Sequence, residues 1–179
     1  MPSKISNFFV SSILMFSVLI APAIINADQY YLNLPGNGFG PETGTASYIR
    51  SISGYLYSTD IINRNFVCSV PFNVPDGSVH FIKSMGPRYK DSLTDGLIRI
   101  RLKRLNLFTG ALHTVAEWES GLDASSGSIQ TESQGTIAGY KLVDTKKFSY
   151  YLYAYFYVDG LVNPDTNLIL YQVRIHYGT

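Results

Sequence analysis

Four tyrosines and three arginines have the types and the spacing to form a binding surface. The tyrosines occur at every second position between Ser149 and Val158, so on a β-strand they would share one face. A phenol offers an apolar ring for stacking and a polar tip, and a guanidinium adds directional hydrogen bonds. If their strands are neighbours, the predicted ligand-binding set is Tyr151, Tyr153, Tyr155, Tyr157, Arg99, Arg101 and Arg174.

The same residues fit two other interpretations. Arginines lying over tyrosine rings of a neighbouring strand form cation–π contacts, each worth about 0.5–1 kcal/mol when exposed, and need no ligand. A contiguous aromatic patch can also be covered by another subunit. The spacing alone leaves all three interpretations open.

Catalytic signatures are missing from the chain. It has no Gly-x-Ser-x-Gly, no His-Glu-x-x-His, no cysteine pair and no Walker loop. Glu117 and Glu119 flank Trp118 and share a face of one strand, whereas the carboxyl pairs of glycosidases face each other across a sugar. We therefore expect no enzymatic activity.

Metal and cofactor sites are also not expected. His80, His113 and His176 fall on different predicted strands, and solvated or edge histidines are the default interpretation. Asp91 and Asp95 lie in a polar stretch before Gly96, where a calcium ion is the alternative to an ordinary turn. The ligand count favours the turn.

Cys68 is the only cysteine, so no disulfide can form within the chain. It shares its parity with Phe66, Val70 and Phe72, which predicts a buried thiol that acts as a small hydrophobe. The domain must then be stabilised by its apolar core.

Strands of two-residue period must position these side chains. Phe148 to Val158 alternates apolar residues with the tyrosines, and Leu97 to Leu105 alternates Ile98, Ile100 and Leu102 with basic residues. Such alternation is typical of antiparallel sheets with one buried face. The last strand, Leu168 to Tyr177, is expected to turn Ile169, Tyr171, Val173, Ile175 and Tyr177 inward.

Further strands are expected between turns rich in Gly, Pro, Asn and Asp. They are Tyr30–Leu34, Ser47–Tyr57 with a bulge at Gly54, Phe66–Phe72, Val79–Met85, Leu112–Glu119 with Leu112, Ala116 and Trp118 on one face, Ile129–Gly135 and Tyr140–Val143. Pro87 to Gly96 is expected to be a loop. The chain has no window of helical period, so the fold class is all-β, a two-sheet antiparallel sandwich of about eight or nine strands.

The N-terminus has the layout of a secretory signal peptide. Lys4 precedes an uncharged, almost unbroken apolar run from Phe8 to Ile25, and small residues mark two possible cleavage points, after Ala23 or after Ala27, of which we favour Ala27. An uncleaved membrane anchor is the alternative, since about 20 apolar residues cross a bilayer. The expected organisation is a signal peptide at 1–27, a Gly/Pro-rich arm at 28–45 and the sandwich at 46–179, in a protein of the cell envelope or the extracellular space.

Charge argues against nucleic acid as a partner. The full chain has 14 basic and 13 acidic residues, and the predicted cleavage removes one basic residue, Lys4. A neutral chain without a basic block has no long-range attraction for nucleic acid. Contact with a membrane is expected only through the N-terminal segment, if that segment is retained.

Four segments resemble bacterial secreted jelly-roll β-sandwich modules, most of which have no assigned function. They are Val70–Ser78, Ile98–Gly110, Tyr150–Leu152 and Leu170–Tyr177. The resemblance spans roughly residues 67–177 and rests on turns and core positions, so it implies the fold and carries over no functional residue. The outward tyrosines at 153, 155 and 157 depart from the shorter polar residues expected there.

Together these patterns predict an exported, non-catalytic binding module. Its expected partner is a carbohydrate or a cell-surface molecule, recognised through the aromatic and cationic sheet face. The alternative is a structural subunit that self-associates into a surface layer or fibre, through its N-terminal arm or through the aromatic face.

Overall fold

The computed structural model describes residues 29–42, 48–50, 54–58, 64–75, 78–94, 96–121, 126–132, 136–137, 139, 141–158 and 168–179. The predicted signal peptide lies outside the described residues, so it stays a prediction. Among the described residues, no helix is long and apolar enough to span a bilayer.

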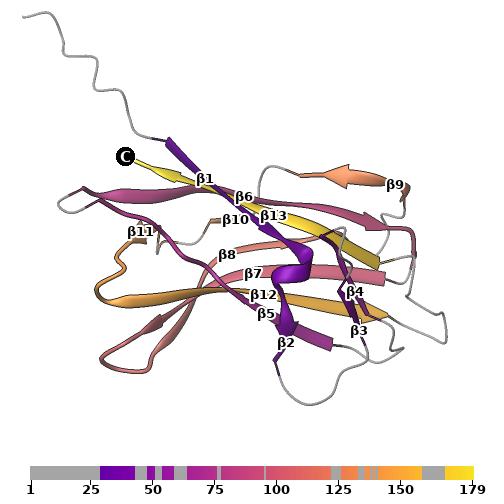
Figure 1. The fold of residues 1–179 in the computed structure, drawn as a ribbon, viewed down its shortest axis with the longest axis horizontal. Coiled ribbons are helices and arrows are strands. Elements are labelled where there is room, and N and C mark those ends of the chain that lie inside the picture. The colour runs from indigo at the N-terminus through magenta and orange to yellow at the C-terminus, as the bar shows by residue number, and fades with distance from the viewer. Residues whose placement is uncertain are drawn as a thin grey trace, which may run out of the picture.

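Two antiparallel sheets pack face to face, as the sequence predicts (Figure 1). Sheet A contains β1 (Gln29–Pro35), β3 (Tyr48–Arg50), β4 (Leu56–Ser58), β6 (His80–Asp91), β9 (Ser126–Thr131), β11 (Leu142–Val143) and β13 (Leu168–Gly178). Sheet B contains β2 (Gly40–Pro41), β5 (Arg64–Ser69), β7 (Gly96–Asn106), β8 (Leu112–Glu119), β10 (Thr136–Ile137) and β12 (Phe148–Val158). The chain passes from sheet B to sheet A between β5 and β6, returns to sheet B between β6 and β7, and passes to sheet A again between β12 and β13, as in a jelly roll.

The core fills the space between the sheets. Ile100 and Leu102 of β7, Leu152 of β12, and Val173 and Ile175 of β13 have no exposed surface. Each such side chain contributes about 1.5–3 kcal/mol by leaving water. The inward rows predicted for β7 and for Phe148 to Phe156 of β12 are confirmed.

The inward row predicted for β13 is partly wrong. Val173, Ile175 and Tyr177 are buried, but Ile169 and Tyr171 are half-exposed while Leu168 and Leu170 are buried. The pairing with β6 shifts register between Leu170 and Gln172. The extra residue of a β-bulge reverses the side-chain alternation at that point.

A second bulge changes the prediction for β8. Its pairing with β7 shifts between Leu102 and Lys103, so both Val115 and Ala116 are buried. Leu112 is consequently 49% exposed, although it was expected to share a face with Ala116 and Trp118. The predicted single strand Ser47–Tyr57 is also wrong, because β3 and β4 pair as two short antiparallel strands.

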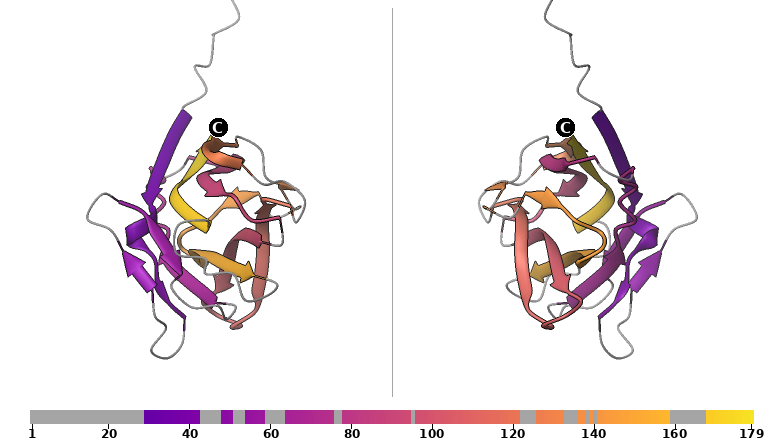
Figure 2. Two further views of the ribbon diagram at one scale, coloured as in Figure 1. Left: turned by 90° about the vertical axis from the view of Figure 1, so that its right-hand side faces the viewer. Right: turned by 90° about the vertical axis from the view of Figure 1, so that its left-hand side faces the viewer.

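The first described segment joins the two sheets at one side of the sandwich. β1 pairs with β13 in sheet A, and β2 pairs with β5 in sheet B. The one-turn 3-10 helix η1 (Gly36–Gly38) lies between them (Figures 1 and 2). Residues 29–35 and 40–41 of the expected arm are therefore paired with strands of their own chain.

Candidate functional site

The four tyrosines share the outer face of sheet B, on the central strand β12. Tyr151, Tyr153, Tyr155 and Tyr157 are all half-exposed, while the alternate residues from Tyr150 to Phe156 are buried. We call the surface formed by Tyr151, Tyr153, Tyr155, Tyr157, Arg99, Arg101 and Lys103 the tyrosine face.

Strand register places a basic residue opposite each of three tyrosines. On the β7 side, Arg99 is opposite Tyr155, Arg101 is opposite Tyr153, and Lys103 is opposite Tyr151. Directly paired residues on one face are close enough for their side chains to interact. Two of the predicted arginines and all four tyrosines therefore lie together.

The third predicted arginine lies on the other sheet. Arg174 belongs to β13, whose partners are β6, β1 and β4, so the condition that its strand neighbours β12 is not met. Its Nε donates a hydrogen bond of 3.0 Å to Asn33 Oδ1. It lines a separate groove of about 520 Å³ together with Tyr31, Arg88 and Gln172.

A shallow groove crosses the middle of the tyrosine face. Its volume is about 310 Å³, and its walls are Asn65, Arg99, Arg101, Lys103, Tyr153 and Tyr155. β12 supplies the two tyrosines, β7 supplies the three basic residues on one side of them, and β5 supplies Asn65 on the other side. The groove combines two aromatic rings with four side chains that can donate hydrogen bonds.

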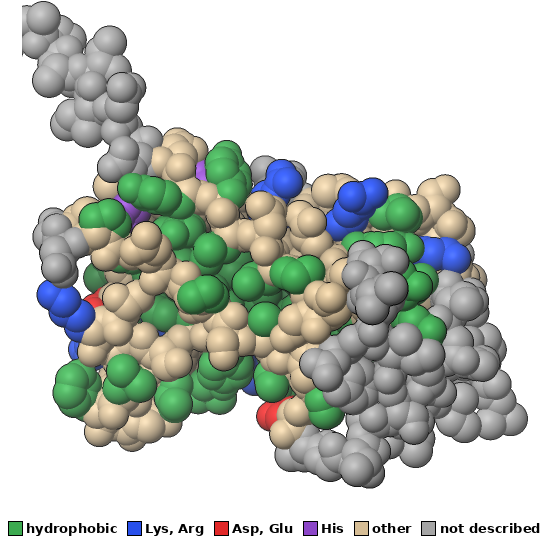
Figure 3. Space-filling view, in the orientation of Figure 1, with side chains coloured by type: hydrophobic (Ala, Val, Ile, Leu, Met, Phe, Trp, Pro, Cys, Tyr) green, Lys and Arg blue, Asp and Glu red, His purple; other side chains and the backbone are tan. Residues whose placement is uncertain are grey.

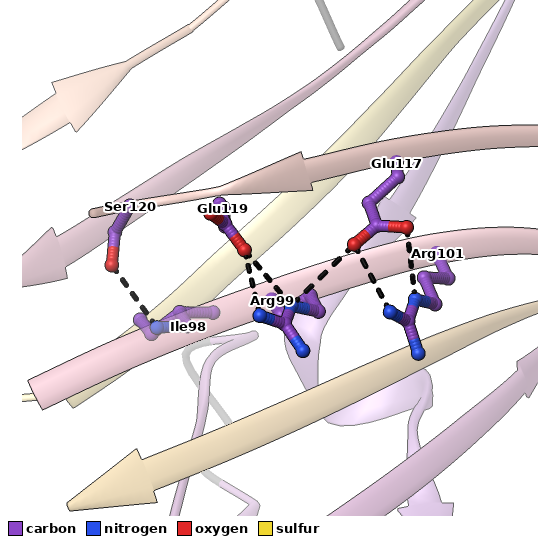
Figure 4. A network of polar contacts seen from close by, with 6 residues as sticks. All are labelled: Ile98, Arg99, Arg101, Glu117, Glu119 and Ser120. Carbon is purple, nitrogen blue, oxygen red and sulfur yellow. Dashed lines mark hydrogen bonds and ion pairs between the residues drawn. The ribbon is translucent and has the colours of Figure 1, made fainter. Parts of the chain in front are cut away.

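Two glutamates on β8 hold the arginines of this groove. Arg101 binds Glu117 through two parallel hydrogen bonds, Nε to Oε2 at 3.0 Å and NH2 to Oε1 at 3.1 Å. Arg99 donates from Nε to Glu119 Oε2 at 2.9 Å and also lies 3.5 Å from Glu117 Oε1 (Figure 4). The hydrogen bond to Glu117 raises the pKa of Arg101 further.

These ion pairs fix the guanidinium groups and balance their charge. Arg99, Arg101, Glu117 and Glu119 are each about one-third to one-half exposed, so the pairs contribute little to stability. Both glutamates are engaged by arginines of the adjacent strand. This arrangement does not place two carboxyl groups on opposite sides of a bound sugar, the geometry that glycoside hydrolysis requires.

Tyr153 is the most constrained ring of the face. The Nζ of Lys103 lies 4.2 Å from its ring centroid, a cation–π contact. Its hydroxyl donates a hydrogen bond to the carboxylate of Glu42. Burial, and then this bond to Glu42, raise the pKa of Tyr153, so the phenol stays protonated at neutral pH.

On the tyrosine face, the cation–π interpretation is therefore met at Tyr153, with a lysine in the place of an arginine; on sheet A, the guanidinium carbon of Arg174 lies 6.0 Å from the ring centroid of Tyr31. Lys103 could have been included from the sequence, since it shares the parity of Arg99 and Arg101. Asn65 and Glu42 could not, because Asn65 belongs to β5, which pairs with β12, and Glu42 follows β2, which pairs with β5, and no local pattern reveals either pairing. Farther along β12, the ring centroids of Tyr155 and Tyr157 are 6.3 Å apart.

Two of the other residues considered for chemistry, His80 and Asp91, are buried. His80 has no exposed surface, so the expectation that all three histidines are solvated is wrong for it; it packs edge-on against Tyr30 and Tyr177. Among the described residues, no group of three His, Cys, Asp or Glu could hold a metal ion. Asp95, half of the alternative calcium site, lies outside the described residues, and Asp91 is buried.

Comparison with known proteins gives only distant structural matches. No family model matches the chain, and no curated protein matches it. A xylan-binding module, CBM15, aligns with TM-score 0.47 and 8% identity over 83% of this chain and 97% of that one. A family 11 carbohydrate-binding module from Clostridium thermocellum, in complex with a β-1,3-1,4-mixed-linked tetrasaccharide, gives 0.37 and 12% over 86% and 90%.

A viral protein gives a score in the same range. The structure of infectious bursal disease virus, Gx strain, aligns with TM-score 0.42 and 9% identity over 86% of this chain and 32% of that chain. Likeness of this degree carries no argument about what the chain binds.

Proposed function

We propose that this chain is a non-catalytic, exported glycan-binding module that binds its ligand on the tyrosine face. The observation that carries the proposal is the groove lined by Tyr153, Tyr155, Asn65, Arg99 and Arg101. Sugar rings have apolar faces that stack on aromatic rings and hydroxyl groups that need directional donors and acceptors. The groove offers both kinds of contact on one sheet.

The charge balance of the groove favours a neutral glycan. Arg99 and Arg101 are paired with Glu119 and Glu117, and Lys103 lies over the ring of Tyr153. A guanidinium held by a carboxylate keeps further N–H groups for a hydroxyl acceptor, because it has five donors in all. An open, shallow groove suits the side of an extended oligosaccharide.

The test is a glycan array with the protein from Asp28 onward, followed by calorimetry on any glycan bound. All the strands described here lie within this part of the chain. In the double variant Tyr153→Ala, Tyr155→Ala, we expect the affinity to fall about tenfold for each ring that stacks on a sugar. Undiminished binding by this variant would overturn the proposal.

Tyr31→Ala is the matched control. Tyr31 is 57% exposed on sheet A, where it stacks on His176 with a centroid distance of 4.6 Å. Its removal should leave glycan affinity unchanged. Loss of binding in this control, with binding kept in the double variant, would move the site to the groove that contains Arg174.

The structural-subunit alternative makes a different prediction. Assembly through the aromatic face would make the size of the protein in solution depend on concentration, and the tyrosine variant would abolish that dependence. Assembly through the arm would require β1 or β2 to leave the partner strands β13 and β5. Sedimentation of the same two proteins without glycan separates these outcomes.

A further inference from the structure

One end of the sandwich gathers most of the exposed apolar side chains. Among the described residues, eight large hydrophobic side chains are exposed, and all but Tyr31 and Ile129 lie at this end. The six are Val79, Phe81, Leu107, Phe108, Leu112 and Leu142. With Lys83, Lys141, Lys146 and Lys147, they form what we call the basic–apolar end.

Strand pairings and hydrogen bonds show that this end is continuous across both sheets. Leu142 of β11 is opposite Phe81 of β6 in sheet A. The backbone N–H of Leu107, next to the β7–β8 turn, donates to the carbonyl of Lys147 at 3.0 Å, directly before β12. Figure 3 shows hydrophobic and basic side chains side by side at the left-hand end, over the β7–β8 turn.

The most exposed apolar side chain is held outward by a well-defined turn. Asn106 Oδ1 accepts hydrogen bonds from the backbone N–H of Phe108 at 2.9 Å and of Thr109 at 3.1 Å. Gly110, at φ 71°, returns its N–H to the carbonyl of Asn106. Phe108 is 79% exposed at the tip of this turn. The geometry thus presents an aromatic side chain to the surroundings instead of folding it back.

The charge around these side chains is mainly positive. Lys141, Lys146 and Lys147 are exposed, and Lys83 Nζ donates to the carbonyl oxygen of Thr179 at 2.8 Å. Among the described residues at this end, the acidic side chain is that of Asp144. Apolar side chains surrounded by lysines match the interface of a bilayer that contains anionic lipids, because rings enter the acyl boundary while ammonium groups stay at the phosphates.

The chain also leaves the described fold at this end. Gln29, the first described residue, is opposite Gly178 in sheet A, and Gly178 is opposite Phe81. The preceding sequence contains the uncharged run from Phe8 to Ile25 that predicts either a signal peptide or an anchor. The right-hand view of Figure 2 looks onto this end, with the β7–β8 turn at the bottom and β1 at the top.

We infer that the basic–apolar end is a membrane-docking surface for an anionic lipid bilayer. β12 begins at this end, where Phe148 is opposite Asn106, the last residue of β7, so Tyr151 lies nearer to this end and Tyr157 farther from it. Docking would therefore leave the tyrosine face standing beside the bilayer and open to solvent. This orientation holds whether the N-terminal run is cleaved or kept.

The experiment is cosedimentation of the protein from Asp28 onward with vesicles of phosphatidylcholine, with and without phosphatidylglycerol. We expect binding only to the anionic vesicles, and weaker binding as salt is raised. The tip variant Leu107→Ser, Phe108→Ser should lower the partition coefficient about tenfold or more, because it removes the side chains that enter the interface. The charge variant Lys146→Glu, Lys147→Glu should abolish the preference for anionic lipid.

Matched controls change the same kinds of residue elsewhere. Ile129→Ser removes an exposed apolar side chain of β9, which pairs with the far half of β6, and Arg88→Glu, Lys90→Glu makes the same charge change on that half of β6. Both should bind like the wild type. Equal binding to neutral vesicles, no binding to anionic vesicles at low salt, or tip-variant binding equal to wild type would overturn the inference. Concentration-dependent dimers lost in the tip variant, without vesicle binding, would assign the end to self-association and also overturn it.

Discussion

Ser120 donates a hydrogen bond of 2.5 Å to the buried carboxyl group of Asp91 and so connects the two sheets. Asp91 ends β6 in sheet A, and Ser120 follows β8 in sheet B. The Oγ of Ser120 also accepts the backbone N–H of Ile98 at 3.0 Å (Figure 4). This polar cluster closes the end of the sandwich opposite the basic–apolar end.

The first prediction concerns pH. Burial raises the pKa of Asp91 from its ordinary value of 3.8 to about 6. The native state therefore binds more protons than the unfolded state between these values, so this group makes stability fall as the pH rises from about 4 to about 6. A shift of about two pKa units corresponds to about 3 kcal/mol. Urea unfolding at a series of pH values measures the change.

Asp91→Asn is the comparison for this measurement, because an amide does not titrate. The free energy of unfolding of the wild type minus that of the variant should decrease across the same pH window and then level off. A difference that is flat from pH 4 to pH 8, or one that increases, would contradict a raised pKa. Subtracting the variant also removes the contribution of every other carboxyl group that behaves alike in both proteins.

The second prediction concerns Gly36, where the chain passes between β13 and β4. A Cβ at this position would lie 2.1 Å from the carbonyl oxygen of Leu170 and 2.7 Å from the backbone nitrogen of Leu56. Both contacts are with backbone, which cannot move aside as a flexible side chain can. We expect Gly36→Ala to lower the free energy of unfolding by at least about 2 kcal/mol. Chemical denaturation measures this loss.

Gly40→Ala is its control. A Cβ at Gly40 would meet no heavy atom within 4 Å. This variant should be close to the wild type in stability. If both variants lose a similar free energy of unfolding, the close approach of Gly36 to Leu170 is not the reason that position 36 requires glycine.

The sequence predicts the strands better than their irregularities. Pro87 illustrates the reason, because a proline between polar residues predicts a loop, yet β6 continues through it to Asp91. The carbonyl of Pro87 accepts the N–H of Glu132 on the β9 side. In a strand the N and O of one residue point to the same side, so the missing N–H faces away from β13 and no bond of that pairing is lost. Only the neighbouring strand reveals this.

The third prediction concerns Cys68, which is half-buried beside the core instead of fully buried as expected. Burial raises the pKa of its thiol. Because the thiolate is the reactive form, iodoacetamide at neutral pH should modify the native protein about tenfold more slowly, or slower still, than the protein in urea. Mass spectrometry of quenched samples gives both rates. Equal rates would show an accessible, reactive thiol.

The tyrosine face could be predicted in part for a physical reason. Two-residue alternation within one strand fixes which side chains share a face, so Tyr151 to Tyr157 and Arg99 to Lys103 each follow from local sequence. That β12 lies beside β7, and that Arg174 lies on the opposite sheet, depends on pairing between distant segments. Alternation carries no information about such pairing.

The last prediction concerns the charge of the ligand. In Glu117→Gln, Glu119→Gln, the guanidinium groups of Arg99 and Arg101 lose the carboxylates that lie within 3.5 Å of them. The face then carries two uncompensated positive charges, which attract anionic polymers in a salt-dependent way. We expect this variant to elute from heparin at higher salt than the wild type, and its affinity for a neutral glycan to fall because the donors are less well oriented.

Glu132→Gln makes half of this charge change on the sheet A side of the molecule, where Glu132 lines the groove that contains Arg174. If Glu132→Gln shifts the elution salt by half as much as the double variant does, the net charge of the protein explains the change. If Glu132→Gln causes little or no shift, the effect belongs to Arg99 and Arg101, because only the double variant removes their carboxylate partners.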